Sequence, residues 1–388
     1  MVRHRRADGG ILLGHGAQVQ VLKVSSTGER RWQQKLLFCS FTAIQFAMIA
    51  DLRSDTVTRP TPAMLDAMWS APVGDDVFGD DPTVKELEQF CANLMGMDAA
   101  IFCPSGTMTN QIGVRLHLKP FEEVICYRGS HVYLNEGGGI AGNSSASVRP
   151  LEAADGILNP AMIEANINPD DPHYARTALV SLENTVNRAG GSYYTLEQVA
   201  AISTNSRRLG LRMHLDGARL FNALVETGES ARQYGSHFDS ISICLSKGLG
   251  APVGSVLLCR KELEHAARRS RKAFGGGMRQ AGYLAAAGLF ALKNNVSRLK
   301  EDHQRARLLG ETLAGLGIVK QVLPVRTNIV IFELEASVPV APMLKWLEEH
   351  GVRAIGFGHQ TIRLVTHLDF NDDMLQHTTD TLKKLSNR

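Results

Sequence analysis

The sequence predicts an α/β fold, in which a mostly parallel, doubly wound sheet carries helices on both faces and a smaller α+β domain follows. Three observations predict it. Short apolar runs typical of buried strands alternate with helical stretches along most of the chain. Polar residues cluster just after these runs, as is typical of ligand sites beyond the carboxyl ends of parallel strands. The chain has 388 residues, enough for a large core divided between two lobes.

Composition excludes several classes of protein. A net charge of +3 is too small to indicate a nucleic-acid binder. No apolar run reaches the roughly 18 residues of a membrane span, so we expect no membrane partner. The six cysteines form no C-x-x-C pair and no histidine spacing typical of zinc. We therefore expect reduced thiols, no metal and a cytoplasmic protein.

Residues 1–47 differ from the rest of the chain. They carry seven Lys or Arg against two acidic residues, and they have no sustained period of 2 or 3.6. We interpret them as a disordered extension, with Met48 as the natural first residue. A signal peptide and a transit peptide are the alternatives.

The globular body begins with a polar stretch at 51–58, which is either a surface turn or an arm that reaches a site. Residues 62–68 predict a helix with proline in its first turn. Thr83 is predicted to cap the next helix, with Glu86 completing a capping box.

The first strand of the sheet is predicted at 99–103. It runs into Ser105-Gly106-Thr107 and then into a helix that ends near Leu118. A turn of small residues between a strand and a helix is typical of an anion site, because free N–H groups and the helix dipole meet there. Ordinary helix capping by Ser105 or Thr107 is the alternative.

The next strands are predicted at 124–127 and 177–182. His131 follows the first of them and precedes the glycines at 137–139. A histidine in this position can stack on a planar ring or move protons. A structural histidine is the alternative.

Two further strands each deliver one charged residue. The apolar run at 213–215 ends at Asp216, with Arg219 close behind, and the run at 241–245 ends at Lys247. Burial lowers the pKa of a lysine, and such an amine can hold a carbonyl cofactor as a Schiff base. Pyridoxal phosphate needs this lysine and an anion at its ring nitrogen, and the two strand ends can supply both. A solvated lysine and an Asp–Arg salt bridge are the alternatives.

The rest of the chain predicts one more strand of the sheet and then the smaller domain. The expected boundary divides a large domain, 48–298, from a small domain, 299–388. The predicted elements are a strand at 253–259, helices at 281–292 and 296–316, a strand at 328–334, a helix at 343–350 and a strand at 361–366.

Residues 48–388 resemble the L-threonine aldolases, in particular the low-specificity bacterial type. The resemblance rests on ordered motifs, among them Asp51-Leu-Arg-Ser-Asp-Thr-Val-Thr58, His214-Leu-Asp-Gly-Ala-Arg219 and Ser246-Lys-Gly-Leu-Gly-Ala-Pro252. It implies a fold-type-I pyridoxal phosphate enzyme, a carbon–carbon lyase of amino-acid metabolism. Such an enzyme cleaves L-threonine, L-allo-threonine and related β-hydroxy-α-amino acids to glycine and an aldehyde.

The resemblance implies roles for the residues that would hold the cofactor. Lys247 would carry the cofactor covalently, Asp216 would pair with the pyridinium nitrogen, and His131 would stack on the ring. These three are the expected catalytic residues. Gly106 and Thr107 would hold the phosphate.

The resemblance also implies a shared site. Arg279 would reach the phosphate of a neighbouring subunit, which indicates a homodimer or homotetramer. Ser54, Arg219 and Arg363 would bind the substrate carboxylate, since the planar fork of arginine matches it. Arg219 would also contact the cofactor.

The chain departs from the family at two positions. Phe78 stands where many members have Tyr, and Val186 stands where some have His. The base at the β-hydroxyl therefore stays open between His131 and an ordered water. Other fold-type-I reactions, β-elimination or transamination, are the alternatives within catalysis, and a non-catalytic scaffold is the alternative outside it.

Overall fold

The computed structural model describes residues 4–5, 11–15, 18–22 and 48–387. The chain divides into two compact units, Met1–Ala47 and Met48–Arg388. The first unit holds a three-stranded antiparallel sheet of β1 (His4–Arg5), β2 (Ile11–His15) and β3 (Gln18–Leu22). Most of the predicted extension lies outside the described residues, so its disorder stays a prediction. Within the described ranges, every helix is too short or too polar to cross a bilayer.

A seven-stranded sheet organises the second unit, as the sequence predicts. Only β11 runs antiparallel to the other strands. The predicted parallel α/β sheet is therefore confirmed. In spatial order the strands are β5 (Ala99–Cys103), β11 (Ser255–Cys259), β10 (Ser240–Cys244), β9 (Arg212–Gly217), β8 (Arg176–Glu183), β6 (Glu122–Tyr127) and β7 (Ser147–Leu151).

The two faces of the sheet have different characters, because successive side chains of a strand point to opposite sides. On β9 and β10, Met213, Leu215, Ile241 and Ile243 pack into the main apolar core. The alternate residues of these two strands are polar, and they face the helix α3 (Gly106–Arg115). The sheet thus has one apolar face and, at its centre, a polar strip beneath α3.

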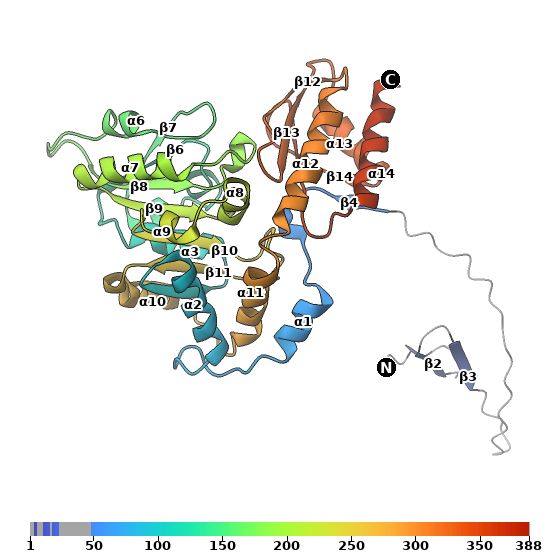
Figure 1. Cartoon of the computed structure of the whole chain (residues 1–388), viewed down its shortest axis with the longest axis horizontal. Coiled ribbons are helices and arrows are strands. Elements are labelled where there is room, and N and C mark those ends of the chain that lie inside the picture. The colour runs from blue at the N-terminus through green and yellow to red at the C-terminus, as the bar shows by residue number, and fades with distance from the viewer. Residues whose placement is uncertain (1–3, 6–10, 16–17, 23–47, 388) are drawn as a thin grey trace. The chain divides into compact units, whose positions relative to one another are not determined.

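Helices cover both faces of this sheet (Figure 1). The main apolar core receives side chains from α2, α7, α8 and α11, whereas α3 and α10 contribute apolar side chains on the other face. The helices of this part are α1 (Pro62–Trp69), α2 (Pro82–Met95), α3, α4 (His131–Leu134), α5 (Gly139–Ser144), α6 (Pro160–Glu164), α7 (Leu196–Arg208), α8 (Leu220–Thr227), α9 (Ala231–Gly235), α10 (Glu264–Ala273) and α11 (Gly282–Asn294).

The predicted cap of α2 is wrong. Asp81 caps this helix, because its Oδ1 accepts hydrogen bonds from the backbone N–H groups of Thr83 and Val84. Thr83 lies inside the first turn and donates its hydroxyl to the carbonyl of Pro72. A carboxylate one residue before a proline caps as well as a threonine does, and Pro82 occupies the first helical position.

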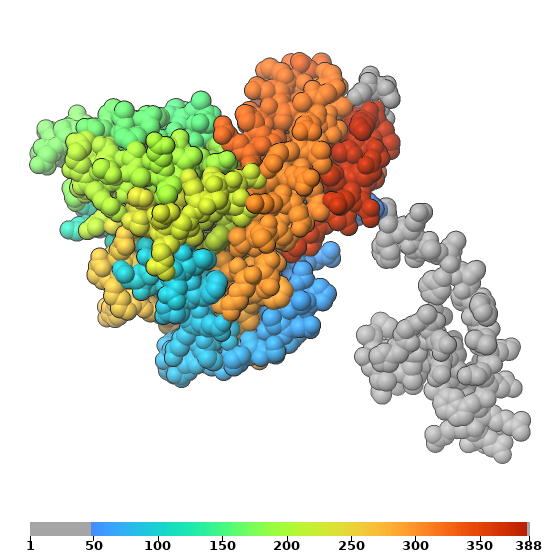
Figure 2. Space-filling model, viewed as in Figure 1, coloured from blue at the N-terminus to red at the C-terminus, as the bar shows by residue number. Residues whose placement is uncertain are grey.

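The C-terminal part, orange to red in Figure 2, has its own sheet and its own apolar core. The sheet order is β12 (Val319–Val322), β13 (Ile329–Leu334), β16 (Thr361–Val365) and β15 (Ile355–Gly356). Three helices accompany it, α12 (Leu299–Ala314), α13 (Val340–Glu349) and α14 (Asp372–Lys383). Its core includes Ala50 and Leu52, because β4 (Ala50–Asp51) pairs with β14 (Val352–Arg353). The domain boundary near residue 298 stays a prediction.

Candidate active site

Two neighbouring parallel strands deliver the predicted lysine and aspartate to one edge of the sheet. Asp216 lies near the end of β9, directly across from Ser242 of β10. Lys247 follows β10 in a tight turn that Gly250 closes by donating its N–H to the Lys247 carbonyl, at 2.8 Å. Gly250 has a φ of +84°, a conformation that a residue with a side chain rarely adopts. The turn therefore brings the half-buried Lys247 to the same edge of the sheet as the buried Asp216.

Asp216 is buried, and each of its carboxylate oxygens accepts a hydrogen bond. Its Oδ2 accepts a hydrogen bond from Asn110 Nδ2 at 2.9 Å, and its Oδ1 accepts one from the backbone N–H of Ala218 at 3.1 Å. Only 1% of the residue is exposed. A buried carboxylate held by two donors keeps a fixed orientation, as a counter-ion for a cationic ring would need.

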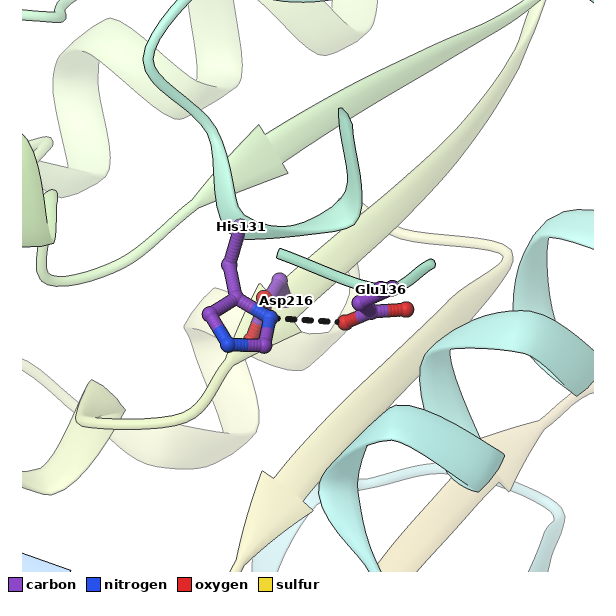
Figure 3. Close-up of side chains that lie close together, drawn as sticks. All are labelled: His131, Glu136 and Asp216. Carbon is purple, nitrogen blue, oxygen red and sulfur yellow. Dashed lines mark hydrogen bonds and ion pairs between the residues drawn. The ribbon is translucent and has the colours of Figure 1, made fainter. Parts of the chain in front are cut away.

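His131 lies at the start of α4, close to Asp216. Its Nδ1 hydrogen-bonds to Glu136 Oε1 at 2.9 Å, and Asp216 lies close by (Figure 3). The hydrogen bond to Glu136 raises the pKa of His131 above its usual value, against the effect of burial. The negative charge of Asp216 raises the pKa of His131 further, and the positive charge of Lys247 lowers it. The structure thus brings two of the predicted catalytic residues, His131 and Asp216, together, and places Lys247 after the strand that neighbours Asp216.

Glu136 is a site residue that the sequence analysis missed. Its side chain is fully buried. Oε1 accepts hydrogen bonds from His131 and Asn110, and Oε2 accepts one from Gln111 at 2.6 Å. The ligand atoms of His131, Glu136 and Asp216 lie within 4.8 Å of one another, a spacing that a metal ion could use. The hydrogen bonds account for this cluster, and the expected absence of a metal stays a prediction.

Glu183 is a second buried carboxylate that the sequence analysis did not single out. Glu183 is the last residue of β8 and lies directly across from Asp216. Its two carboxylate oxygens accept hydrogen bonds from the backbone N–H groups of His131 (2.6 Å) and Asn187 (2.8 Å). Burial, and then the nearby Asp216 charge, raise the pKa of Glu183 to about 7. Glu183 therefore anchors the turn that carries His131. Its position after an apolar strand was the available signal.

The predicted anion site at the start of α3 has the expected form. Ser105 is the N-cap, and its Oγ accepts a hydrogen bond from Met108 N at 3.2 Å. This capping is the alternative that the sequence left open for Ser105. It does not use the N–H groups of Gly106 and Thr107, which have no acceptor within the helix. These two residues therefore keep donors for an anion, and Thr107 is exposed.

Arg219 makes a buried ion pair that the sequence did not predict. Its Nε and NH2 atoms donate to Asp55 Oδ2 at 2.8 Å and to Oδ1 at 2.6 Å. Both residues are buried, at 6% and 0% exposure. The fork of Arg219 is thus occupied by Asp55, and only its remaining nitrogen is left to bind a substrate or cofactor. The role predicted for Arg219 stays a prediction.

Arg363 is a buried arginine without an ion pair among the described residues. NH1 donates to Asn187 Oδ1 at 2.8 Å and NH2 to the Arg53 carbonyl at 3.1 Å, while the buried Nε has no partner. Burial and repulsion by Arg219 lower the pKa of Arg363 to about 10. An uncompensated buried cation needs an anion, so Arg363 suits a substrate carboxylate better than Arg219 does.

Within the described residues, Ser54 and Arg279 form no side-chain hydrogen bond or ion pair with the other predicted site residues. Ser54 is half-buried, and its hydroxyl accepts hydrogen bonds from the N–H and hydroxyl of Thr56. Arg279 is exposed and pairs with Asp75 of its own chain at 3.0 Å. The structure describes no contact between Arg279 and the other predicted site residues, which leaves its role across a subunit interface a prediction.

The two positions that depart from the resembled family are very different. Val186 is fully buried and lines the main core, and a Cβ on Gly156 would lie 2.5 Å from its Cγ1. Phe78 is 77% exposed, so its ring lies on the surface of the described chain.

Known proteins resemble this chain in sequence over most of its length. The family model described as "Beta-eliminating lyase" matches residues 51–337. The low specificity L-threonine aldolase of Escherichia coli (strain K12) is 45% identical over 328 residues, which cover 84% of this chain and 96% of that protein. The low-specificity L-threonine aldolase 1 of Arabidopsis thaliana is 41% identical over 337 residues, covering 84% and 94%.

Solved structures share the fold. The threonine aldolase of Leishmania major superposes with a TM-score of 0.75 at 24% identity and covers 87% of this chain and 99% of that chain. A putative L-allo-threonine aldolase from Listeria monocytogenes has a TM-score of 0.73 at 20% identity, covering 87% and 97%.

Proposed function

The chain belongs to the beta-eliminating lyase family and, within it, to the low-specificity L-threonine aldolases, and we propose that it cleaves L-threonine and L-allo-threonine to glycine and acetaldehyde with pyridoxal phosphate. One observation carries the proposal. Neighbouring strands bring Asp216 and Lys247 to the same edge of the sheet, and His131 senses the charges of both.

The residues present fit pyridoxal phosphate. Lys247 would hold the cofactor covalently. The carboxylate of Asp216, which accepts two hydrogen bonds, would pair with the ring nitrogen. The free N–H groups of Gly106 and Thr107 would bind the phosphate. When bound, the cofactor supplies an electron sink for the carbanion left by carbon–carbon cleavage.

The substrate carboxylate would bind to Arg363. Asn187 and the Arg53 carbonyl hold this guanidinium in place, and its Nε is still free to donate. A fixed carboxylate determines which Cα bond stands perpendicular to the cofactor ring, and in an aldolase that bond is Cα–Cβ. Arg219, after β9, and Ser54, in the N-terminal arm at 51–58, would complete the pocket. Thr58 ties this arm to Lys247 by a hydrogen bond to the Lys247 carbonyl at 3.1 Å.

His131 is the base that the site supports best. Glu136 accepts the hydrogen bond of Nδ1, so the neutral ring carries its proton on Nδ1 and its lone pair on Nε2. Nε2 can then take the proton of the substrate β-hydroxyl. General bases contribute about 10²–10⁴-fold in rate. His131→Asn should therefore lower kcat by about this factor, and an unchanged kcat would remove His131 from the mechanism.

The direct test measures the products of three substrates. Acetaldehyde released from L-threonine and L-allo-threonine is compared with pyruvate released from L-serine, which would report β-elimination instead. We expect acetaldehyde from both threonines and little pyruvate. Lys247→Ala should abolish product and the visible absorbance of the bound cofactor. A wild-type protein that binds no pyridoxal phosphate would refute the proposal and favour a non-catalytic scaffold.

We infer that the active form is a homodimer or homotetramer with shared sites. The exposed position of Arg279 supports this, since its side chain is available to a neighbouring subunit. Size-exclusion chromatography with light scattering, on wild type and Arg279→Ala, tests it. A fully active monomer would refute it.

A further inference from the structure

Behind Asp216, on the side away from the carboxyl edge, a row of polar side chains is buried between α3 and the sheet. Asn110 joins Asp216 to His214, whose Nε2 lies 3.2 Å from Asn110 Oδ1. His214 Nδ1 lies 2.8 Å from Ser240 Oγ, and this hydroxyl lies 2.8 Å from His117 Nε2. The row thus reaches from the site to His117, which is half-buried.

The fold builds this row through strand register. Ser240 lies directly across from His214 in the β9–β10 pair, on the face that α3 covers. Gly113 of α3 lies against the imidazole, and a Cβ there would be only 2.3 Å from His214 Cε1. The helix therefore leaves a space that fits the histidine ring. His214 and Ser240 have no exposed surface, and Asn110 has 2%.

The direction of every hydrogen bond in the row follows from its inner end. Asn110 Nδ2 lies 2.8 Å from Glu136 Oε1 and 2.9 Å from Asp216 Oδ2, and carboxylates only accept. The amide oxygen of Asn110 must then face His214 and accept a hydrogen bond from its Nε2–H. Burial lowers the pKa of His214 to about 3, so the ring is neutral and its Nδ1 has no proton.

The hydrogen-bond directions at Ser240 and His117, the outer end of the row, follow in the same way. Since His214 Nδ1 is an acceptor, Ser240 donates its hydroxyl proton to it, and the Ser240 oxygen accepts from His117 Nε2. Each group donates toward Asp216. Dipoles aligned in this way reinforce one another and strengthen the hydrogen bond that Asn110 donates to Asp216.

We propose that this row is a relay of hydrogen bonds that positions the Asp216 carboxylate for the ring nitrogen of pyridoxal phosphate: Asn110, His214, Ser240 and His117. The inference rests on the proposed function, because it assigns the cofactor nitrogen as the partner of Asp216. The relay moves no proton during the reaction. Its members are positioning residues that act through Asp216.

The chain offers a matched control for the middle of the relay. Ser242 lies on the same strand and the same face as Ser240, is equally buried, and pairs across the sheet with Asp216 itself. Its hydroxyl, however, bonds to Thr109 Oγ1 at 2.6 Å and lies outside the relay. Ser240→Ala and Ser242→Ala therefore each remove one buried hydroxyl, and only the first interrupts the row.

A second pair of variants separates chemistry from packing. His214→Gln places an amide N–H near the position of Nε2, so it can still donate to Asn110. His214→Asn is shorter and keeps a polar atom only near Nδ1. His214→Gln keeps the inner bond to Asn110 and loses only the acceptor for Ser240, whereas His214→Asn loses the inner bond. A relay therefore predicts that His214→Gln binds pyridoxal phosphate more tightly than His214→Asn does.

The readout is the dissociation constant for pyridoxal phosphate, measured by titrating the full-length protein after the cofactor has been removed. A buried neutral hydrogen bond contributes about 1 kcal/mol net, which corresponds to about 5-fold in affinity. We expect Ser240→Ala and His214→Gln to weaken binding by about 5-fold, His214→Asn to weaken it further, and Ser242→Ala to stay within about 2-fold. Thermal unfolding of the cofactor-free forms identifies any variant that is merely misfolded.

Equal affinities for Ser240→Ala and Ser242→Ala would overturn the relay, as would a His214→Gln protein as weak as His214→Asn. If the wild type binds pyridoxal phosphate and releases acetaldehyde, such a result refutes only the relay. If the wild type does neither, the proposed function fails instead.

Discussion

The buried ion pair between Asp55 and Arg219 gives the sharpest prediction on stability. Asp55→Asn keeps the shape of the side chain but removes its charge and one of its two acceptor oxygens. The Arg219 guanidinium, 6% exposed, then stays buried without a counter-ion. Breaking a buried pair in this way costs about 3–5 kcal/mol.

This cost can be converted into a melting temperature. Unfolding entropy is about 2.1 cal/mol/K per residue, so the roughly 340 residues of the second unit give about 0.7 kcal/mol/K. A loss of about 3–5 kcal/mol then lowers Tm by about 4–7 °C. Differential scanning calorimetry at fixed protein concentration measures the shift, and concentration matters because subunit association also stabilises.

The sign of the pH dependence follows from Asp55. Burial by itself raises its pKa, but Arg219 outweighs burial, and the pKa falls well below the usual 3.8. A carboxylate with a lowered pKa stabilises the fold above its unfolded pKa and loses this effect as the pH falls through the folded pKa. The Tm difference between wild type and Asp55→Asn should therefore be constant from about pH 6 to 8 and shrink only in strong acid.

An exposed pair provides the control. Arg128 and Glu152 lie 2.5 Å apart, but their side chains are 66% and 72% exposed. Water and salt screen such a pair, so Glu152→Gln should lower Tm by less than about 1 °C. If Asp55→Asn shifts Tm no more than Glu152→Gln, burial does not determine the strength of these pairs and the reasoning fails.

Three further predictions concern the site itself. Glu136→Gln removes the group that raises the pKa of His131, so the acid limb of the kcat/KM profile should move to lower pH. The variant should also lose more stability at pH 5.5 than at pH 9. A raised pKa means that protonated His131 stabilises the fold, and this effect is lost as the pH rises above that pKa. Arg363→Lys loses the planar fork, and we expect kcat/KM for L-threonine to fall by about 10–100-fold, mainly through KM; an unchanged KM would place the substrate carboxylate elsewhere. Gly113→Ala adds a Cβ 2.3 Å from His214, so calorimetry should find a lower Tm by about 1–4 °C, from overpacking of about 1–3 kcal/mol, and an unchanged Tm would mean that the ring can move aside.

The sequence by itself determined the sheet and the two strand ends that matter most. The apolar runs at β9 and β10 are continuous enough to indicate buried strands, and the first charged residues near their ends are Asp216 and Lys247. Parallel strands bring their carboxyl ends to one edge, so these two residues had to lie at the same edge once both strands entered one sheet. The motifs around them identified the family, and the relatives at 41–45% identity agree with it.

Only the tertiary structure decided which groups each charged residue meets. Arg219 pairs with Asp55, which lies 164 positions away in the chain, and Asn110 reaches Asp216 across 106 positions. No local pattern specifies such partners, because they depend on strand register and on the placement of a helix over the sheet. The alternation of Ser240 and Ser242 with isoleucines was visible in the sequence, but a period of two does not say which polar face meets α3. The local sequence pattern thus identifies the reactive side chains. Long-range packing determines the partners that orient these side chains and shift their pKa values.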